Sequence, residues 1–302
     1  MTDFEETPCL VCNSNQPYPY SKKGQFGLPT FVVICRNCGF SYLNPRWTKE
    51  RYHLFYTKEY DTYYRPQVIT RNYNYDPARA VKMILDRSAG IIDLKKNSLN
   101  ILDVGAGMGD SLTYLKKEVN PGANYYAIES SEHCIEHLKK QGIELLTNDV
   151  DTDWDTAHEE KFDFIIMRHV LEHFLDPGAV LSKVRRALKP DGVLYVAVPN
   201  AKKPGWPLLA SFFRVVHVSY FSGISLTSLL AQKGLKNIRI VEGDSHEKRE
   251  IFSFCARTIP AKQQTDPSEW LAQKKIYDSF LRKELYYRLR TFVGKKIVPL
   301  FK

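Results

Sequence analysis

Two patterns of apolar and polar positions, one typical of strands and one of helices, alternate between residues 98 and 258. Short apolar runs typical of buried strands lie at 99–104, 124–129, 143–146, 162–168, 192–198, 236–241 and 250–257. Amphipathic spacing typical of helices lies at 110–118, 131–141, 176–189 and 222–233. This alternation predicts βα units on a mostly parallel sheet. Because no helix separates the last two strands, we expect them to form an antiparallel hairpin, and Pro190-Asp191-Gly192 predicts a turn before the fifth strand.

The pattern changes outside this stretch, which divides the chain into four consecutive segments. We expect a cysteine-rich ribbon at 1–46, a helical lid or linker at 47–97, a ligand-binding α/β domain at 98–258 and a helical tail at 259–302. No apolar run is long enough to span a bilayer, and the first eight residues are acidic and polar. A cytoplasmic location is therefore expected.

Positive charge is concentrated in the tail. The chain has a formal net charge of +9, and from Lys274 to Lys302 nine Lys or Arg stand against Asp278 and Glu284, a net +7. The nearly balanced remainder weighs against a nucleic-acid partner. Apolar residues recur at helical spacing among the tail's cations, which fits peripheral contact with an anionic membrane. A helix packed on the protein or on a partner, with its charges solvated, fits the same pattern.

A glycine-rich loop follows the first strand of the α/β domain. It reads Asp103-Val-Gly105-Ala-Gly107-Met-Gly109 and leads into a helix. Glycines allow a tight turn and close approach of a ligand to the backbone. Dehydrogenase loops space their glycines G-x-G-x-x-G and bind a diphosphate. Asp103 would repel a diphosphate but can pair with the ammonium of a methionine moiety, so the loop favours S-adenosylmethionine over NAD.

Three further residues are candidate cofactor contacts. Glu129 ends the second strand, where a carboxylate can accept hydrogen bonds from both ribose hydroxyls. Asp149, after the third strand, can reach the adenine amino group, although a helix cap or a solvated loop would also account for it. Arg168 ends the fourth strand and is the last candidate.

The order of these elements resembles class I methyltransferases over residues 98–257. The similarity is most specific at 101–109, and it extends to 162–166 with Val-Leu-Glu172-His173 and to the turn at 188–192. The resemblance implies a Rossmann-like seven-stranded sheet whose last strand is antiparallel, with S-adenosylmethionine as the methyl donor.

Two Cys-x-x-Cys pairs, Cys9/Cys12 and Cys35/Cys38, are separated by 22 residues. This spacing is typical of a four-thiolate Zn²⁺ site, which leaves no open position and is therefore structural. The run 35–40, followed by 43–46 and 56–60, resembles bacterial methyltransferases with an N-terminal zinc ribbon.

Those methyltransferases typically act in sugar-nucleotide or surface-glycan pathways. The resemblance therefore implies that the acceptor of this chain is a small molecule or a glycan. Their sugar C-methyltransferases carry a further C-terminal domain, whereas about 45 residues follow the last strand here. O-methylation of a sugar hydroxyl is therefore favoured. C-methylation, a zinc-ribbon RNA methyltransferase and a non-enzymatic binding protein remain as alternatives. Against RNA, no Asn/Asp-Pro-Pro-Tyr/Phe sequence follows the fourth strand.

A sugar hydroxyl must lose a proton on methylation, so a base near the methyl group is expected. His173 is the first candidate and His217 the second. His217 resembles a family motif in which an acid precedes the histidine, but Val216 stands there. His169 would share a face with His173 in a helix, or it would pack beside the adenosine. A core or capping role is the alternative for each histidine.

Aromatic residues predict a cover for the acceptor. Tyrosines between the ribbon and the α/β domain form a candidate lid: Tyr60, Tyr63, Tyr64, Tyr73 and Tyr75. An apolar insertion at 204–215 with Trp206, Leu208, Leu209, Phe212 and Phe213 would cover the acceptor or form a homodimer contact. Ordinary packing is the alternative for the tyrosines.

Overall fold

The structure is a computed structural model that describes residues 3–64, 76–205, 207–262 and 265–297, with side chains in the last helix as far as Tyr286. It divides into two compact units. The cysteine unit comprises 1–59, 200–225 and 265–302, and the sheet unit comprises 60–199 and 226–264. The units are thus interleaved along the chain, whereas the sequence pattern predicts four consecutive segments.

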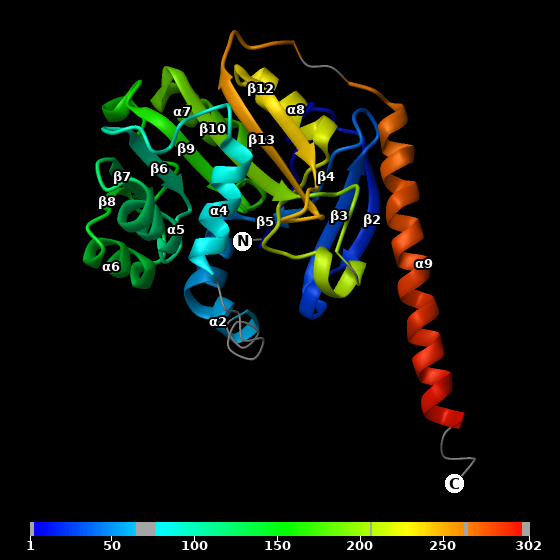
Figure 1. The fold of residues 1–302 in the computed structure, drawn as a ribbon. Helices are drawn as coiled ribbons and strands as arrows, with labels where there is room; N and C mark the ends of the chain where they lie inside the picture. The colour runs from blue at the N-terminus through cyan, green and yellow to red at the C-terminus, as the bar shows by residue number, and fades with distance from the viewer. Residues whose placement is uncertain (1–2, 65–75, 206, 263–264, 298–302) are drawn as a thin grey trace. The chain divides into compact units, whose positions relative to one another are not determined.

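The sheet unit is built on seven strands in the order β12-β13-β10-β9-β6-β7-β8 (Figure 1). Their bounds are β6 Asn100–Val104, β7 Asn124–Ile128, β8 Glu144–Thr147, β9 Phe162–Arg168, β10 Leu188–Pro199, β12 Leu235–Glu242 and β13 Glu250–Arg257. Strands β6 to β10 pair in parallel, and β13 is antiparallel to both neighbours. The predicted sheet, with its closing hairpin, is confirmed.

One detail of that prediction is wrong. Residues 190–192 do not form a turn ahead of the fifth strand but lie inside β10. The pairing register with β9 shifts between Leu188 and Val193. The Pro and Gly are accommodated as an irregularity within the strand, which is where sheets tolerate such residues.

The sheet unit also contains helices and short helical turns. They are α2 Tyr60–Tyr63, α4 Pro77–Ser88, α5 Asp110–Tyr114 continued by η3 Leu115–Val119, α6 Glu132–Lys140, η4 Thr156–His158, η5 Leu171–His173, α7 Pro177–Ala187 and most of α8 Gly223–Gln232. Asp76 and Asp176 cap α4 and α7, each followed by a proline in the first helical turn. Apolar side chains of α4, α5 and α6 share one buried cluster with β6, β9, β10 and β13. These three helices therefore cover the same face.

The cysteine unit contains an antiparallel sheet in the order β11-β4-β3-β2 and a two-stranded pair, β1-β5. Its elements are β1 Phe4–Glu5, β2 Pro17–Lys23, η1 Gln25–Gly27, β3 Pro29–Cys35, β4 Ser41–Leu43, β5 Arg46–Trp47, α1 Lys49–Leu54, η2 Phe55–Glu59, η6 Leu208–Phe212, β11 Ser219–Tyr220 and α9 Ser268–Ile297. No helix of the described residues is long and apolar enough to cross a membrane.

The insertion and the tail belong to the core of this unit. Val32 and Ile34 of β3 pack with Phe212, Phe213 and Tyr277 in one buried cluster. Gln273 of α9 donates a hydrogen bond to the Ala201 carbonyl, 2.8 Å away. The first half of α9, drawn in orange in Figure 1, is therefore a packed helix, as one of the two interpretations of the tail expects. Trp206 lies outside the described residues.

Candidate cofactor and active site

The glycine-rich loop joins β6 to α5, and its glycines are required by geometry. Gly105, Gly107 and Gly109 all have positive φ, at 77°, 57° and 71°. A Cβ on Gly105 would lie 2.6 Å from Val170 Cγ2, and one on Gly109 would lie 2.3 Å from Leu138 Cδ2. A Cβ on Gly107 would meet nothing within 4 Å. The loop is thus closed beneath its first and last glycines and open at Gly107.

Glu129 is brought to this opening by strand register. Strand β7 pairs with β6 so that Ile128 stands opposite Val104, and the residues after both strands lie together at the carboxyl edge. Glu129 Oε2 accepts a hydrogen bond from the Gly107 amide at 2.7 Å, and its Oε1 accepts one from the Ser131 amide at 2.9 Å. The predicted contact residues Gly107 and Glu129 therefore share one site.

Asp103 and Arg168 meet at the same edge. The Asp103 side chain is buried, with 8% of the residue exposed. This burial raises the pKa of Asp103 to about 7, the charge of Arg168 lowers it, and the charge of Glu129 raises it. Among the described residues, Arg168 Nε is buried without a hydrogen-bond partner. A cationic group placed here would favour ionised Asp103, so this carboxyl fits the ammonium end of S-adenosylmethionine, whereas Arg168 carries the same charge as an ammonium and does not.

Asp149 is held in a turn after β8. It is exposed, and its Oδ1 accepts a hydrogen bond from the Asp151 amide at 2.8 Å. Its backbone amide is bonded to Thr147 Oγ1 at 3.1 Å. Asp149 thus stabilises a solvated loop, as the alternative interpretation expects, and its contact with adenine stays a prediction.

The segment after β9 carries two of the candidate bases. His169 and His173 do not share a helical face, because the helical turn η5 covers only 171–173 and His169 has a left-handed φ of 54°. Both instead flank Glu172, which is buried. Its Oε1 lies 3.7 Å from His169 Nδ1 and 4.0 Å from His173 Nε2.

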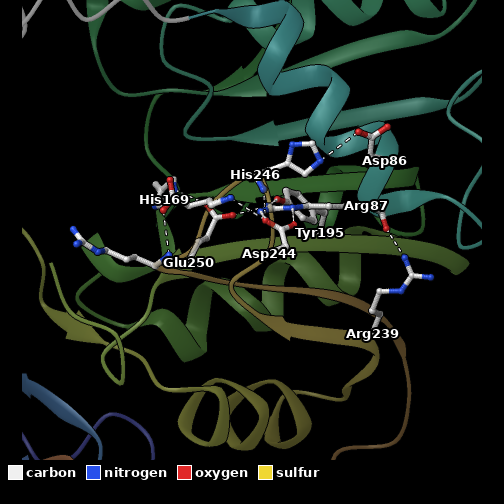
Figure 2. Close-up of polar contacts among 10 residues, drawn as sticks. Asp86, Arg87, His169, Tyr195, Arg239, Asp244, His246 and Glu250 are labelled. Atoms are coloured by element: carbon white, nitrogen blue, oxygen red, sulfur yellow. Dashed lines mark hydrogen bonds and ion pairs between the residues drawn. The ribbon is translucent and has the colours of Figure 1, made fainter. Parts of the chain in front are cut away.

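A buried ion-pair network, which the sequence pattern does not predict, lies behind His169 (Figure 2). His169 Nε2 is 2.6 Å from Oε2 of Glu250, the first residue of β13. The other oxygen of Glu250 accepts a hydrogen bond from Arg87 of α4. Arg87 also forms a two-point contact with Asp244, at 2.8 and 3.0 Å, and donates to Tyr195 Oη at 2.7 Å.

The network fixes the charge of His169. Partial loss of hydration lowers the pKa of His169, but its contacts with Glu172 and Glu250 outweigh this effect and raise the pKa to about 9. At neutral pH the ring is therefore an imidazolium, and an imidazolium has no lone pair with which to accept a proton. This argues against His169 as the base.

Comparison with known proteins identifies the family. A family model described as a methyltransferase domain matches residues 65–240, more than half of the chain. The chain belongs to the methyltransferase domain family. Its seven-stranded sheet is that of class I S-adenosylmethionine-dependent methyltransferases, as the resemblance implies.

Individual relatives agree with this family. Ubiquinone biosynthesis O-methyltransferase of Pasteurella multocida is 30% identical over 36% of this chain and 50% of its own length. Malonyl-[acyl-carrier protein] O-methyltransferase of Acetivibrio thermocellus is 32% identical over 40% of this chain and 44% of its own. The matches thus span half or less of these relatives.

A solved structure agrees at the level of the fold. It is Burkholderia thailandensis 1,6-didemethyltoxoflavin-N1-methyltransferase with bound S-adenosylhomocysteine, with 16% identity and a TM-score of 0.52 over 80% of this chain and 99% of that one.

The methyltransferase domain is accompanied by four buried thiols in the cysteine unit. Cys9 Sγ lies 3.6 Å from Cys38 Sγ, and Cys12 Sγ lies 3.4 Å from Cys35 Sγ. All four sulfurs lie within 4.8 Å of one another. A disulfide needs about 2.05 Å, whereas sulfurs 2.3 Å from one tetrahedral ion are about 3.8 Å apart. The predicted ligands are therefore arranged to hold a metal ion.

The two remaining site predictions are placed as follows. His217 belongs to the cysteine unit, where it is buried and its ring lies 6.3 Å from that of Tyr220. In the sheet unit the rings of Tyr60 and Tyr64 are stacked at 4.8 Å. Tyr73 and Tyr75 lie outside the described residues, and the lid stays a prediction.

Proposed function

We propose that this methyltransferase domain protein transfers the methyl group of S-adenosylmethionine to a hydroxyl of a sugar, in a nucleotide sugar or a surface glycan. The observation that carries the proposal is the pairing of Gly107 and Glu129 beside open space at the carboxyl edge of the sheet. Asp103 lies in β6 just before the glycines of the same loop and would bind the ammonium of the methionine moiety. Glu129 would bind the ribose, and Asp149 the adenine.

S-adenosylmethionine supplies the methyl group when it is bound. The chain must hold the acceptor oxygen in line and remove its proton. His173 is suited to the second task because it follows β9, and its side chain is 30% exposed beside the Glu172 carboxylate. The acceptor hydroxyl would give up its proton to His173 as its oxygen takes up the methyl group. His217 is the second candidate for this base.

The choice of O-methylation is supported by the names of two relatives, both O-methyltransferases. The sugar acceptor is supported by the resemblance of residues 35–46 to zinc-ribbon glycan methyltransferases. We further propose that the four thiols bind a structural Zn²⁺, because four sulfurs close a tetrahedral site. Small-molecule acceptors are expected, and a nucleic-acid acceptor is not.

Incubation with [methyl-³H]S-adenosylmethionine tests the proposal. The acceptors offered would be a panel of UDP- and dTDP-sugars, with total RNA in parallel. Label in a nucleotide sugar, released as an alkali-stable methyl ether, supports O-methylation. Label on a sugar carbon would favour C-methylation, and label in RNA alone would overturn the sugar proposal. Ala replacements of His173 and His217, made separately, identify the base by the loss of turnover; full turnover in both would remove the general-base proposal.

A further inference from the structure

His169 is held in an uncommon conformation beside the cofactor loop. Its φ of 54° lies in the left-handed region that few non-glycine residues occupy, and its amide donates to the Ala197 carbonyl at 2.8 Å. The next residue, Val170, is the one that closes the loop at Gly105. Strain of this kind persists only where the surroundings impose it, and it is concentrated at functional sites.

Two buried carboxylates hold the side chain of His169. The side chains of Glu250 and Glu172 are 1% and 2% exposed, whereas that of His169 is 38% exposed. A buried carboxylate needs a counter-charge, because its desolvation is otherwise too costly. Arg87 supplies one to Glu250 but is shared with Asp244. His169 therefore serves as a counter-charge for both glutamates.

Glu172 has one oxygen left over. Its Oε1 faces the two histidines, while its Oε2 is buried without a hydrogen-bond partner among the described residues. An unsatisfied buried acceptor lowers stability, and the cost is larger when the acceptor is charged. Native proteins rarely leave such an atom without a role. A donor from a ligand would satisfy it, and a sugar carries hydroxyl donors on neighbouring carbons.

We propose that Glu172 binds a hydroxyl of the sugar acceptor next to the one that is methylated, and that His169 is the positioning residue that holds Glu172 in place. This inference rests on the proposed function. Glu172 would then select which hydroxyl reaches His173. The Nε2 of His173 lies 4.0 Å from Oε1 of Glu172. The inner network of Glu250, Arg87 and Asp244 sets the orientation of His169 and touches no substrate.

Nuclear magnetic resonance of ¹⁵N-labelled histidine side chains tests the positioning role of His169 and needs no acceptor. The His169 signals are assigned by their absence in His169→Gln. We expect both ring nitrogens to be protonated at pH 7.5 in the wild type, and Glu250→Gln to shift the titration of the ring to lower pH. The charged groups around this ring are Glu172, Glu250 and, behind Glu250, Arg87. A neutral His169 ring at pH 7.5 would overturn the positioning role.

Kinetics with the UDP- and dTDP-sugar panel test whether Glu172 binds a hydroxyl of the acceptor. Glu172→Gln should raise KM for the accepted nucleotide sugar about 10- to 100-fold, the value of a hydrogen bond to a charged group. His169→Gln should have a smaller effect in the same direction. The Kd of S-adenosylhomocysteine should stay unchanged in both. His133→Gln, an exposed histidine of α6, is the matched control with wild-type kinetics.

The two proposals fail in different ways. If the wild type does not bind S-adenosylhomocysteine, the proposed function fails. If it binds and transfers label, but Glu172→Gln and His169→Gln keep the wild-type KM and kcat, only this inference is overturned. Thermal unfolding of each variant shows whether it is folded. If Glu172→Gln does not fold, the kinetics of His169→Gln decide whether the inference holds.

Discussion

Replacing Asp103 with asparagine separates the stability of the sheet unit from its ligand binding. The substitution keeps the size of the side chain and removes its charge. In the wild type, burial raises the pKa of this carboxyl from 3.8 to about 7. The folded protein therefore holds a proton on Asp103 at pH values where the unfolded chain has already released it.

The magnitude follows from that difference. Between pH 3.8 and about 7 the folded state binds more protons than the unfolded state, so the free energy of unfolding falls as the pH rises. The slope is about 1.4 kcal/mol per pH unit, and the total is about 4 kcal/mol, reached near pH 7 and constant above it. The amide that replaces the carboxyl in Asp103→Asn does not titrate. Between pH 5 and 8 the variant should therefore gain about 3 kcal/mol relative to the wild type.

Urea unfolding of both proteins at pH 5, 6, 7 and 8 measures this change, and calorimetry with S-adenosylhomocysteine measures binding. We expect the variant to gain stability relative to the wild type and to lose most of its affinity for the ligand. In the wild type, affinity should weaken below pH 7, because protonated Asp103 cannot pair with an ammonium. A stability difference that is the same at pH 5 and pH 8 would refute the reasoning.

Two further predictions concern the loop and the thiols. Gly107→Ala should cost about 1 to 2 kcal/mol of stability because φ is positive, and it should abolish binding of S-adenosylhomocysteine. The control Gly90→Ala, at an equally open glycine with positive φ, should cost the same stability and leave binding intact. Equal affinities of the two variants in calorimetry would contradict the open side of the loop as the ligand site. Purified protein should contain about one zinc per chain by elemental analysis. The Cys12→Ser variant should lose the zinc, and its cysteine unit should unfold. A metal-free wild type with an unchanged circular dichroism spectrum would exclude a structural ion.

Local rules were enough to predict the sheet and much of the cofactor edge. Apolar runs indicated strands within one or two residues, except at β10. The register of parallel strands brings residues after β6 and β7 together, so Gly107 and Glu129 could be foreseen as neighbours. The Cys-x-x-Cys pairs likewise specify their own geometry.

Contacts between distant segments could not be read in this way. Glu250 begins the antiparallel β13, and pairing of Pro199 with Glu250 places it beside the end of β10. Arg87 reaches it from α4, 163 residues away in sequence. Nothing in the local pattern of either residue differs from an ordinary surface charge. For the same reason the insertion and the tail did not reveal that they share a core with the ribbon strands.

The central claim is that the loop from Asp103 to Gly109, with Glu129, binds S-adenosylmethionine. Isothermal titration with S-adenosylhomocysteine at pH 8 tests it most directly, with wild type and Glu129→Ala side by side. We predict saturable binding of one molecule per wild-type chain and an affinity at least tenfold weaker in the variant. The absence of binding by the folded wild type, or equal affinity in both, would contradict the account.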